Sequence, residues 1–388
     1  MVDFNNTKTA FALKSDAQLR KAYWLFRLVA NRSLVVFGKK ASNLAIKLRL
    51  PIRFLVKKTV YGQFVGGENI EECEPIITKL QKQNVFSLLD YAVEGKETET
   101  DCDQTKDEIV QTIEYGAKRK GVPFAVFKVT GVAEFSLLEK YSAGLPLTEL
   151  ENQAWLRSKS RVEEICSAAN ELGLKIMFDA EESWIQNAID EIAMEMMERF
   201  NQGKVVVVNT LQMYRVDRLA FLKESYRAAQ EKDFRLGVKL VRGAYMEKER
   251  ERADQQGYPH PIYADKNGSD QSYDDGLDFV LENYENILMV AGSHNEDSAL
   301  KLSNQMGEKK IDRKHPNLWF SQLYGMSDNL SFNLAAEGYN VVKYLPFGPV
   351  NETLPYLIRR AEENTSASGQ SNRELSLIQQ ELKRRANS

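Results

Sequence analysis

Two adjacent arginines near the carboxyl end of the sequence are the clearest candidates for binding chemistry. Arg359 and Arg360 lie in the segment YLPFGPVNETLPYLIRRAEEN. Thr353 can cap a helix in this segment, and Pro355 is tolerated in its first turn. Such a helix places Tyr356 on the same face as both arginines, because residues three and four apart are neighbours. Two guanidinium groups can clamp a carboxylate. A solvated arginine pair near a helix end is the alternative interpretation.

Polar residues also stand at the ends of several short apolar segments. The active site of a β/α barrel lies at the carboxyl ends of its strands, so such residues are site candidates. A strand can also end in a polar residue simply because a loop begins there, and one position alone decides little. The candidates are Asp90, Lys128, Asp179, Asn209, Lys239, Gln322 and Tyr344.

The elements that would position these residues alternate along the chain. Longer charge-rich segments with helical periodicity separate the short apolar ones, and this order predicts a parallel sheet. Eight units over about 280 residues match a (β/α)8 TIM-like barrel. An open doubly wound sheet is the alternative, but no GxGxxG turn follows the first strand. The expected strands are Val85–Asp90, Phe124–Val129, Lys175–Asp179, Val205–Asn209, Gly237–Val241, Ile287–Gly292, Leu318–Gln322 and Val341–Tyr344.

Three regions are expected. Residues 1–80 form a basic helical arm, residues 81–365 form a distorted barrel, and residues 366–388 form a flexible link and a short helix. Residues 1–60 hold thirteen Lys or Arg and two Asp, a net charge of +11, whereas the whole chain carries −3. This asymmetry suggests an anionic surface as partner. We expect a lipid surface and no nucleic acid. Helices packed on the barrel with basic outer faces explain the arm equally well.

Other features narrow the class of protein. No apolar run reaches the roughly 18 residues that span a bilayer, and the first residues resemble neither a signal nor a transit peptide. Cys73, Cys102 and Cys166 form no CxxC pair, which favours a reducing compartment and excludes a cysteine zinc site. Three scattered histidines make a metal site improbable. A cytoplasmic protein, peripheral on the inner face of the cytoplasmic membrane, is expected.

Several blocks resemble the proline dehydrogenase family, in the family's order and over about residues 60–365. The arginine segment resembles the family signature, and the pattern is closest to the monofunctional members. The other blocks are LLDYAVEGK, FDAEE, VVNTLQMY, KLVRGAYMEKER, GSHNED and FSQLYGMSDNLSF.

The resemblance implies a chemistry and a set of roles. Members oxidise L-proline to Δ1-pyrroline-5-carboxylate with FAD and pass the electrons to a membrane quinone. Arg359 and Arg360 would bind the substrate carboxylate, and Tyr344 and Tyr356 would wall the ring. The implied catalytic residues are Asp179, Lys239 and Lys128, of which Lys128 would also contact the substrate.

The implied cofactor contacts follow the same blocks. Lys239 would lie near the reactive edge of the flavin, where some members have Arg. Asn209 stands where some members have Gln. The remaining implied contacts to FAD are Ala180, Arg242, Gly243, Ala244, Ser293 and His294.

Three alternatives are weighed against this interpretation. A hydroxyproline dehydrogenase would share the site but not the preference, and a Tyr at position 344 leaves little room for a ring hydroxyl. A flavin barrel of the methylenetetrahydrofolate reductase kind does not explain the Arg359–Arg360 pair. A non-enzymatic protein that binds membrane or nucleic acid through the basic arm leaves the strand-end residues without a role.

Overall fold

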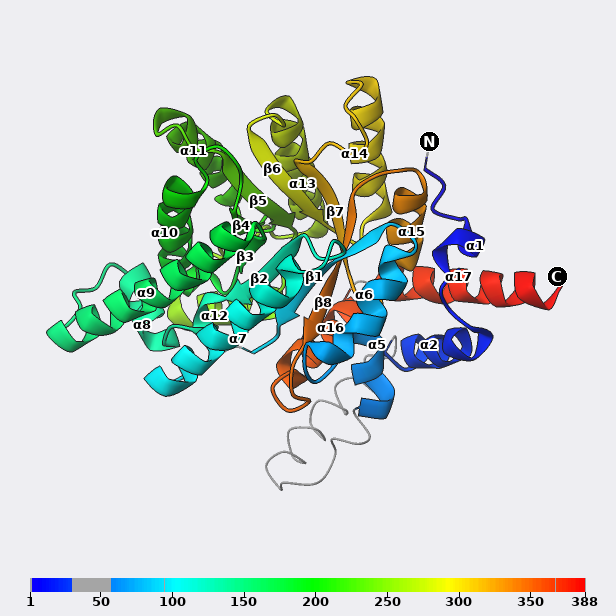
Figure 1. Cartoon of the computed structure of the whole chain (residues 1–388), viewed down its shortest axis with the longest axis horizontal. Helices are drawn as coiled ribbons and strands as arrows, with labels where there is room; N and C mark the ends of the chain where they lie inside the picture. Colours follow the sequence, from blue (N-terminus) through cyan, green and yellow to red (C-terminus); the bar gives the residue numbers. More distant parts are fainter. Residues whose placement is uncertain (1, 30–56, 94, 367, 388) are drawn as a thin grey trace.

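The eight expected strands form a closed barrel of parallel strands, in which β8 returns to pair with β1. The computed structural model describes residues 2–29, 57–93, 95–366 and 368–387. Figure 1 shows the strands at the centre of the molecule and the helices around them. The predicted fold class is confirmed. The strands are β1 (Val85–Tyr91), β2 (Phe124–Lys128), β3 (Lys175–Asp179), β4 (Val207–Gln212), β5 (Leu236–Val241), β6 (Ile287–Gly292), β7 (Leu318–Leu323) and β8 (Val341–Phe347).

Two strands extend three residues beyond their predicted ends. β4 begins at Val207 and continues to Gln212, three residues beyond the expected end. β8 runs through Pro346 to Phe347. Proline lacks only the backbone donor. Pro346 still pairs with Asp90 of β1, and its carbonyl accepts a hydrogen bond from the Gly66 amide, outside the sheet, at 2.8 Å.

Helices cover the outside of the barrel, and their ends follow local signals. α9 begins with a capping box between Thr148 and Glu151 and ends at Gly173, whose φ of 71° suits a glycine C-cap. The barrel helices are α7 (Glu99–Ala117), α8 (Phe135–Ser142), α9 (Glu149–Leu172), α10 (Ser183–Phe200), α11 (Arg218–Glu231), α12 (Met246–Gln256), α13 (Lys266–Glu282), α14 (Glu296–Glu308), α15 (Asp328–Ala336) and α16 (Leu354–Ser366), with a short 3-10 turn η3 (Val129–Gly131) after β2.

The two ends of the chain pack together on one side of the barrel (Figure 1). The segments before β1 are α1 (Thr7–Ala10), α2 (Asp16–Val29), η1 (Lys57–Tyr61), α5 (Gly62–Phe64), η2 (Glu71–Cys73) and α6 (Glu74–Gln81). α17 (Ser368–Ala386) lies against α2, and α1 lies against α15. Residues 368–374 are therefore helical where the sequence predicts a link. Leu377 and Ile378 are buried and anchor this helix.

The core is divided by the alternation of side chains along each strand. One set of residues faces the barrel interior, and the other faces the helices. Leu88, Val126, Met177, Val208 and Val342 belong to the interior cluster, which also receives residues of α2, α5 and α17. The helix-facing residues form a second, larger cluster.

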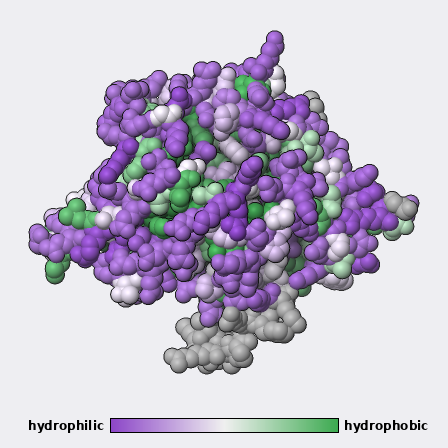
Figure 2. Space-filling model, viewed as in Figure 1, coloured by the Kyte–Doolittle hydropathy of each residue, from purple (hydrophilic) through white to green (hydrophobic). Residues whose placement is uncertain are grey.

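The face of the molecule seen in Figure 2 is mostly hydrophilic. A few large apolar residues are exposed in the described part of the chain. Leu145 and Leu150 are exposed at the start of α9, and Trp24 and Leu28 are exposed on α2. Among the described residues, no helix is both long enough and apolar enough to cross a membrane. Residues 30–56 of the predicted basic arm fall outside the described residues.

Candidate active site

Five charged or hydroxyl side chains from five strands meet at the carboxyl-end mouth of the barrel. Asp90, Lys128, Asp179, Lys239 and Tyr344 occupy interior-facing positions near the ends of β1, β2, β3, β5 and β8. Lys128 and Asp179 are direct neighbours in the β2–β3 register. Five of the seven strand-end candidates therefore lie in one layer, whereas Gln322 faces the helices and accepts a hydrogen bond from Ser331 of α15, and Asn209 is described below.

Asp179 is the centre of this layer. Its Oδ1 accepts a hydrogen bond from the Lys239 ammonium, and its Oδ2 accepts one from the Tyr344 hydroxyl at 2.8 Å. The Lys128 Nζ lies 3.6 Å from the same Oδ2. Burial alone would raise the pKa of Asp179, but Lys239 and Lys128 outweigh it and hold that pKa at about 2. Asp179 is thus a permanent anion that fixes two lysines and a tyrosine.

Asp90 behaves in the opposite way. Its side chain is buried, with 2 % of its surface exposed, and its Oδ1 has no hydrogen-bond partner. Burial and the neighbouring charge of Asp179 raise its pKa to about 7, although Lys128 and Tyr344 oppose the rise. The mouth therefore contains one carboxylate and one carboxyl group that titrates near neutral pH.

The arginine helix reaches the same mouth. On α16, Arg360 is buried and Arg359 is half-buried. The guanidinium of Arg359 lies 5.8 Å from the ring centre of Tyr245, and the guanidinium of Arg360 lies 5.1 Å from that of Tyr356. Lys128 and Arg359 both act electrostatically on Tyr245, so they approach it from two elements. The arginines are not a solvated pair at a helix end.

A second group of predicted residues gathers at β5 and β6. The Arg242 guanidinium donates to Asp270 at 2.6 Å, to Ser293 at 2.7 Å and to Ser298 at 2.9 Å. These bonds hold its charge in one place. His294 is affected chiefly by burial and also by Lys343, Arg360 and Arg242, which together lower its pKa to about 3. His294 is therefore neutral at pH 7.

The backbone beside Arg242 leaves no room for a larger residue. Gly243 has a φ of 155°, and a Cβ added there would come within 2.4 Å of the Tyr214 ring. Gly292 faces the interior at the end of β6, where a Cβ would meet Val241 at 2.9 Å. Gly243 and Gly292 therefore form a surface of small residues beside Arg242 and Lys239.

Asn209 is not part of the mouth, and this corrects its predicted cofactor contact. Its side chain faces the helix layer, where its Nδ2 donates to Asp190 of α10 at 2.8 Å. Asp190 in turn pairs with Arg218 of α11 at 2.5 Å. Side chains alternate along β4, so Asn209 lies on the outward face with Val207 and Leu211, and the interior face carries Val208, Thr210 and Gln212.

Gln212 is the residue that the sequence reasoning missed at this strand. Its Nε2 donates to the Glu181 carbonyl at 2.7 Å, and its Oε1 accepts from the Ala244 amide at 3.0 Å. It therefore joins the loops after β3 and β5. Glu181 also accepts from the Thr130 hydroxyl at 2.6 Å, which holds the turn after Lys128. The sequence VVNTLQMY contained the signal, because side chains alternate along a strand: Thr210 and Gln212 share one face, and Asn209 and Leu211 share the other.

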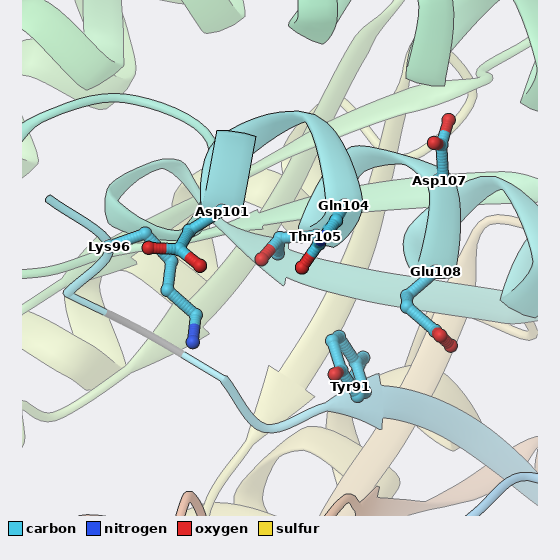
Figure 3. A pocket seen from close by; sticks show the side chains of 7 residues that line it. All are labelled: Tyr91, Lys96, Asp101, Gln104, Thr105, Asp107 and Glu108. Carbon is cyan, nitrogen blue, oxygen red and sulfur yellow. The ribbon is translucent and has the colours of Figure 1, made fainter. Parts of the chain in front are cut away.

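Surface pockets lie elsewhere. Figure 3 shows one beside the end of β1, where Tyr91 and Lys96 face residues of α7. Its other lining residues are mainly acidic, and it contains none of the predicted site residues. A second pocket lies near Lys175 and Arg235, at the opposite ends of the strands. Within the described ranges, no group of three or more His, Cys, Asp or Glu side chains could hold a metal ion.

The fold and the mouth define a β/α-barrel protein with a charged site at the carboxyl ends of its strands. The sequence profile named proline dehydrogenase matches residues 73–373. The chain belongs to the proline dehydrogenase family.

Individual relatives agree with this assignment. Proline dehydrogenase 1, mitochondrial, of Dictyostelium discoideum is 33% identical over 98% of this chain and 74% of its own. Hydroxyproline dehydrogenase of Xenopus laevis is 31% identical over 97% of this chain and 88% of its own. The carbapenem antibiotics biosynthesis protein CarD of Pectobacterium carotovorum subsp. carotovorum is 36% identical over 83% of each chain.

A solved structure supports the fold. Proline utilization A (PutA) from Bdellovibrio bacteriovorus, inactivated by N-propargylglycine, superposes with a TM-score of 0.71 at 21% identity. The match covers 92% of this chain and 38% of that chain. At this identity the likeness shows the barrel fold alone.

Proposed function

We propose that this protein oxidises L-proline to Δ1-pyrroline-5-carboxylate with FAD and passes the electrons to a membrane quinone, as the first step of proline breakdown. The observation that carries the proposal is the meeting of Arg359, Arg360 and Lys128 with the Asp179–Lys239 pair at one mouth. Three cations beside a small apolar wall suit a ring compound with a carboxylate.

The residues present fit a flavin. Gly243 and Gly292 stand where a Cβ would collide with neighbours, so neither position accepts a larger residue. Arg242, fixed by Asp270, Ser293 and Ser298, supplies a positive charge whose position is set in advance. We assign cofactor binding to Lys239, Arg242, Gly243, Gly292, Ser293 and His294, together with Ala180 and Ala244. In this set Gln212 takes the place of Asn209.

When bound, FAD accepts the hydride from the carbon beside the ring nitrogen. The chain supplies position and field. Arg359 and Arg360 hold the carboxylate, while Tyr344 and Tyr356 wall the ring. Lys128, Lys239 and Arg242 stabilise the negative charge that develops during the transfer, because fixed cations in a dry site need no reorganisation. Asp179 is a positioning residue of the reaction, because it holds Lys239 and the Tyr344 hydroxyl in place.

The substrate is the point at which the relatives diverge. A hydroxyproline dehydrogenase among them keeps that reaction as the second candidate. Tyr344 favours proline, because its ring lies in the interior layer and its hydroxyl is already bonded to Asp179. A methylenetetrahydrofolate reductase type of reaction leaves the arginine pair without a role.

The membrane part of the proposal places the protein in the cytoplasm, peripheral on the inner face of the membrane. It is supported by the +11 charge of residues 1–60 and by Trp24 and Leu28, which are 58% and 55% exposed on α2. Each basic residue near an anionic surface contributes about 1 kcal/mol, and salt weakens it. Co-sedimentation should show binding to anionic vesicles and none to neutral ones; equal binding to both would contradict it.

The reaction is tested by mixing the yellow protein with L-proline without oxygen and following the flavin absorbance. We expect bleaching by proline. Arg359→Met and Arg360→Met should each weaken substrate saturation by about 10- to 150-fold, which corresponds to the roughly 1.5–3 kcal/mol of a charge-assisted bond. Arg235→Met, on the opposite end of the barrel, is the matched control. A colourless protein, or unchanged saturation in both variants, would refute the proposal.

A further inference from the structure

Asp90 is a buried carboxyl group of the mouth to which the proposed reaction gives no role. It stands near the end of β1, one strand from Lys128 and one strand from Tyr344, and faces the interior of the barrel with them. Its Oδ1 is buried and makes no hydrogen bond. A buried polar atom without a partner is costly, so its presence at a candidate site calls for a function.

The groups around Asp90 come from both neighbouring strands and from two strands further round the barrel. Lys128 of β2, Asp179 of β3, Lys239 of β5 and the Tyr344 hydroxyl of β8 all act on it. The two lysines are committed to Asp179, which lies within 3.6 Å of Lys128 and is directly bonded to Lys239. Asp90 and Asp179 are therefore a pair of carboxyl groups, and Asp179 makes the closest contacts with the two lysines.

The proposed reaction requires a proton acceptor. A cyclic secondary amine is protonated in neutral water, and its nitrogen then has no lone pair with which to form a C=N bond. We propose that Asp90 accepts this proton from the bound substrate, so that it is the general base of the reaction. The inference rests on the proposed function and deepens it, because it selects a substrate that arrives as a secondary ammonium ion.

The substrate loses one proton and one hydride in this reaction. One N–H bond of the ammonium breaks, its proton forms an O–H bond with Oδ1 of ionised Asp90, and the nitrogen keeps the electron pair. That pair forms the C=N bond while the neighbouring C–H bond breaks, and the hydride passes to the flavin of the proposed function. The organic product is a protonated cyclic imine, oxidised by two electrons.

Asp179 cannot fill this role. Its oxygens already accept hydrogen bonds from Lys239 and Tyr344, and with a pKa of about 2 it holds a proton poorly. A carboxyl whose pKa is about 7 is ionised in part at neutral pH and still binds the transferred proton well. Two carboxyls whose surroundings separate their pKa values commonly divide their roles in this way.

The test uses the flavin-loaded protein and its Asp90→Asn variant. The rate constant for flavin reduction by limiting L-proline is measured from pH 5.5 to 9 without oxygen. In the native protein this constant should rise through an ionisation near pH 7. In Asp90→Asn that ionisation should vanish, and the constant near neutral pH should fall roughly 100-fold.

The matched control is Glu374→Gln. Glu374 is a buried carboxyl whose pKa is also raised to about 7, but it lies on α17 and outside the mouth. This variant should keep the native pH profile. If Glu374→Gln removes the ionisation and Asp90→Asn retains it, the assignment to Asp90 is overturned.

A second substrate separates an enzyme base from loss of the proton in solution. Ring-fluorinated proline has a more acidic amine. If the ionisation near neutral pH stays in place with this substrate, the proton is accepted by the protein. If it moves with the acidity of the amine, the substrate binds already deprotonated and the proposal falls.

Two further measurements keep the proposal testable if Asp90→Asn binds FAD poorly. Asp90→Glu retains a carboxyl and should retain an ionisation in the profile. The infrared difference between native protein and Asp90→Asn should contain a protonated carboxyl band that disappears above about pH 7. If this band is absent, the proposal is overturned.

Native flavin that proline cannot reduce at any pH would refute the proposed reaction itself. An unchanged pH profile in Asp90→Asn would refute only the role of Asp90.

Discussion

Two buried networks of nearly the same composition lie on opposite faces of the barrel wall. At the mouth, Asp179 bridges Lys128 and Lys239, and Asp90 is the second carboxyl. Outside β8, Asp328 bridges two lysines, and Glu374 of α17 is the second carboxyl. The Asp328 oxygens lie 2.9 Å from Lys343 and 2.7 Å from Lys14. We call them the mouth network and the wall network.

The pKa values follow the same pattern in both. Burial raises the pKa of Asp328, but Lys14 and Lys343 outweigh it and bring that pKa to about 2. Burial, followed by the charge of Asp328, raises the pKa of Glu374 to about 7. Composition and perturbed pKa values therefore do not distinguish a site from a structural network.

The difference lies in what each network leaves for a ligand. Glu374 accepts a hydrogen bond from the Ser327 amide, and Lys343 donates to the carbonyl of Met326. These contacts join α17 and the amino-terminal segment to the barrel. Asp90 instead buries an oxygen without a partner at the strand ends. Position in the barrel and an unused bonding group, rather than charge, indicate the site.

The first prediction tests the difference between the two networks by the same substitution at their central aspartates, Asp179 and Asp328. Asp179→Asn should slow flavin reduction by roughly 100- to 1,000-fold, because Lys239 and Tyr344 lose the group that orients them. Asp328→Asn should leave the rate per bound flavin nearly native. It should lower the free energy of unfolding by about 3–5 kcal/mol, because Lys343 stays buried without its counter-ion. Urea unfolding and stopped-flow reduction measure the two effects; equal loss of rate in both variants would contradict the division.

The second prediction sharpens the comparison through pH. The folded pKa of Glu374 is raised from 4.5 to about 7, so the folded state holds a proton that the unfolded state has lost. Stability therefore falls as pH rises from about 4.5 to about 7, and the deficit persists above that range. Glu374→Gln removes this term. It should be neutral at pH 4.5 and more stable than the native protein at pH 8, by at most about 3 kcal/mol.

Unfolding curves of both proteins at the two pH values provide the measurement. Asp90→Asn should behave alike in stability, because the pKa of Asp90 is raised for the same first reason, burial. Only Asp90→Asn should lose activity. A Glu374→Gln variant that is no more stable at pH 8 would show that Glu374 ionises normally in the fold.

The mouth network was easier to predict from the sequence than the wall network, because its residues follow the alternation of side chains along the strands. Strand ends are short, local signals, so Asp179, Lys239 and Tyr344 could be found by alternation and by family blocks. Lys14, Asp328 and Glu374 come from segments far apart in the chain, and no local pattern joins them. The terminal helix α17 was shortened in prediction because SASGQSNRE resembles a link, whereas packing against α2 overrides its weak helix propensity.

Errors within the site had a similar origin. A one-residue alternation decides whether a strand residue faces the interior or the helices. The expected end of β4 at Asn209 therefore selected the outward residue and missed Gln212. Asp90 was recognised as a strand-end residue but received no role, because its missing hydrogen bond is visible only after folding.

The last prediction concerns Tyr344, which belongs to the mouth network and also limits the space for the ring of the substrate. Its hydroxyl donates to Asp179 at 2.8 Å, and its ring centre lies 5.1 Å from the Lys239 ammonium. Tyr344→Ser opens space for a ring hydroxyl and should reduce the preference for proline over 4-hydroxyproline by about 10-fold, since apolar pockets discriminate weakly against an added hydroxyl. Tyr344→Phe keeps the ring and loses the hydroxyl, which bonds Asp179 and also acts on Asp90. It should therefore slow the oxidation of both substrates alike and keep the preference.

The ratio of kcat/KM for proline and 4-hydroxyproline is measured in all three proteins at equal flavin content. A preference that survives in Tyr344→Ser would make Tyr344 a member of the mouth network alone and place selectivity on another wall of the site.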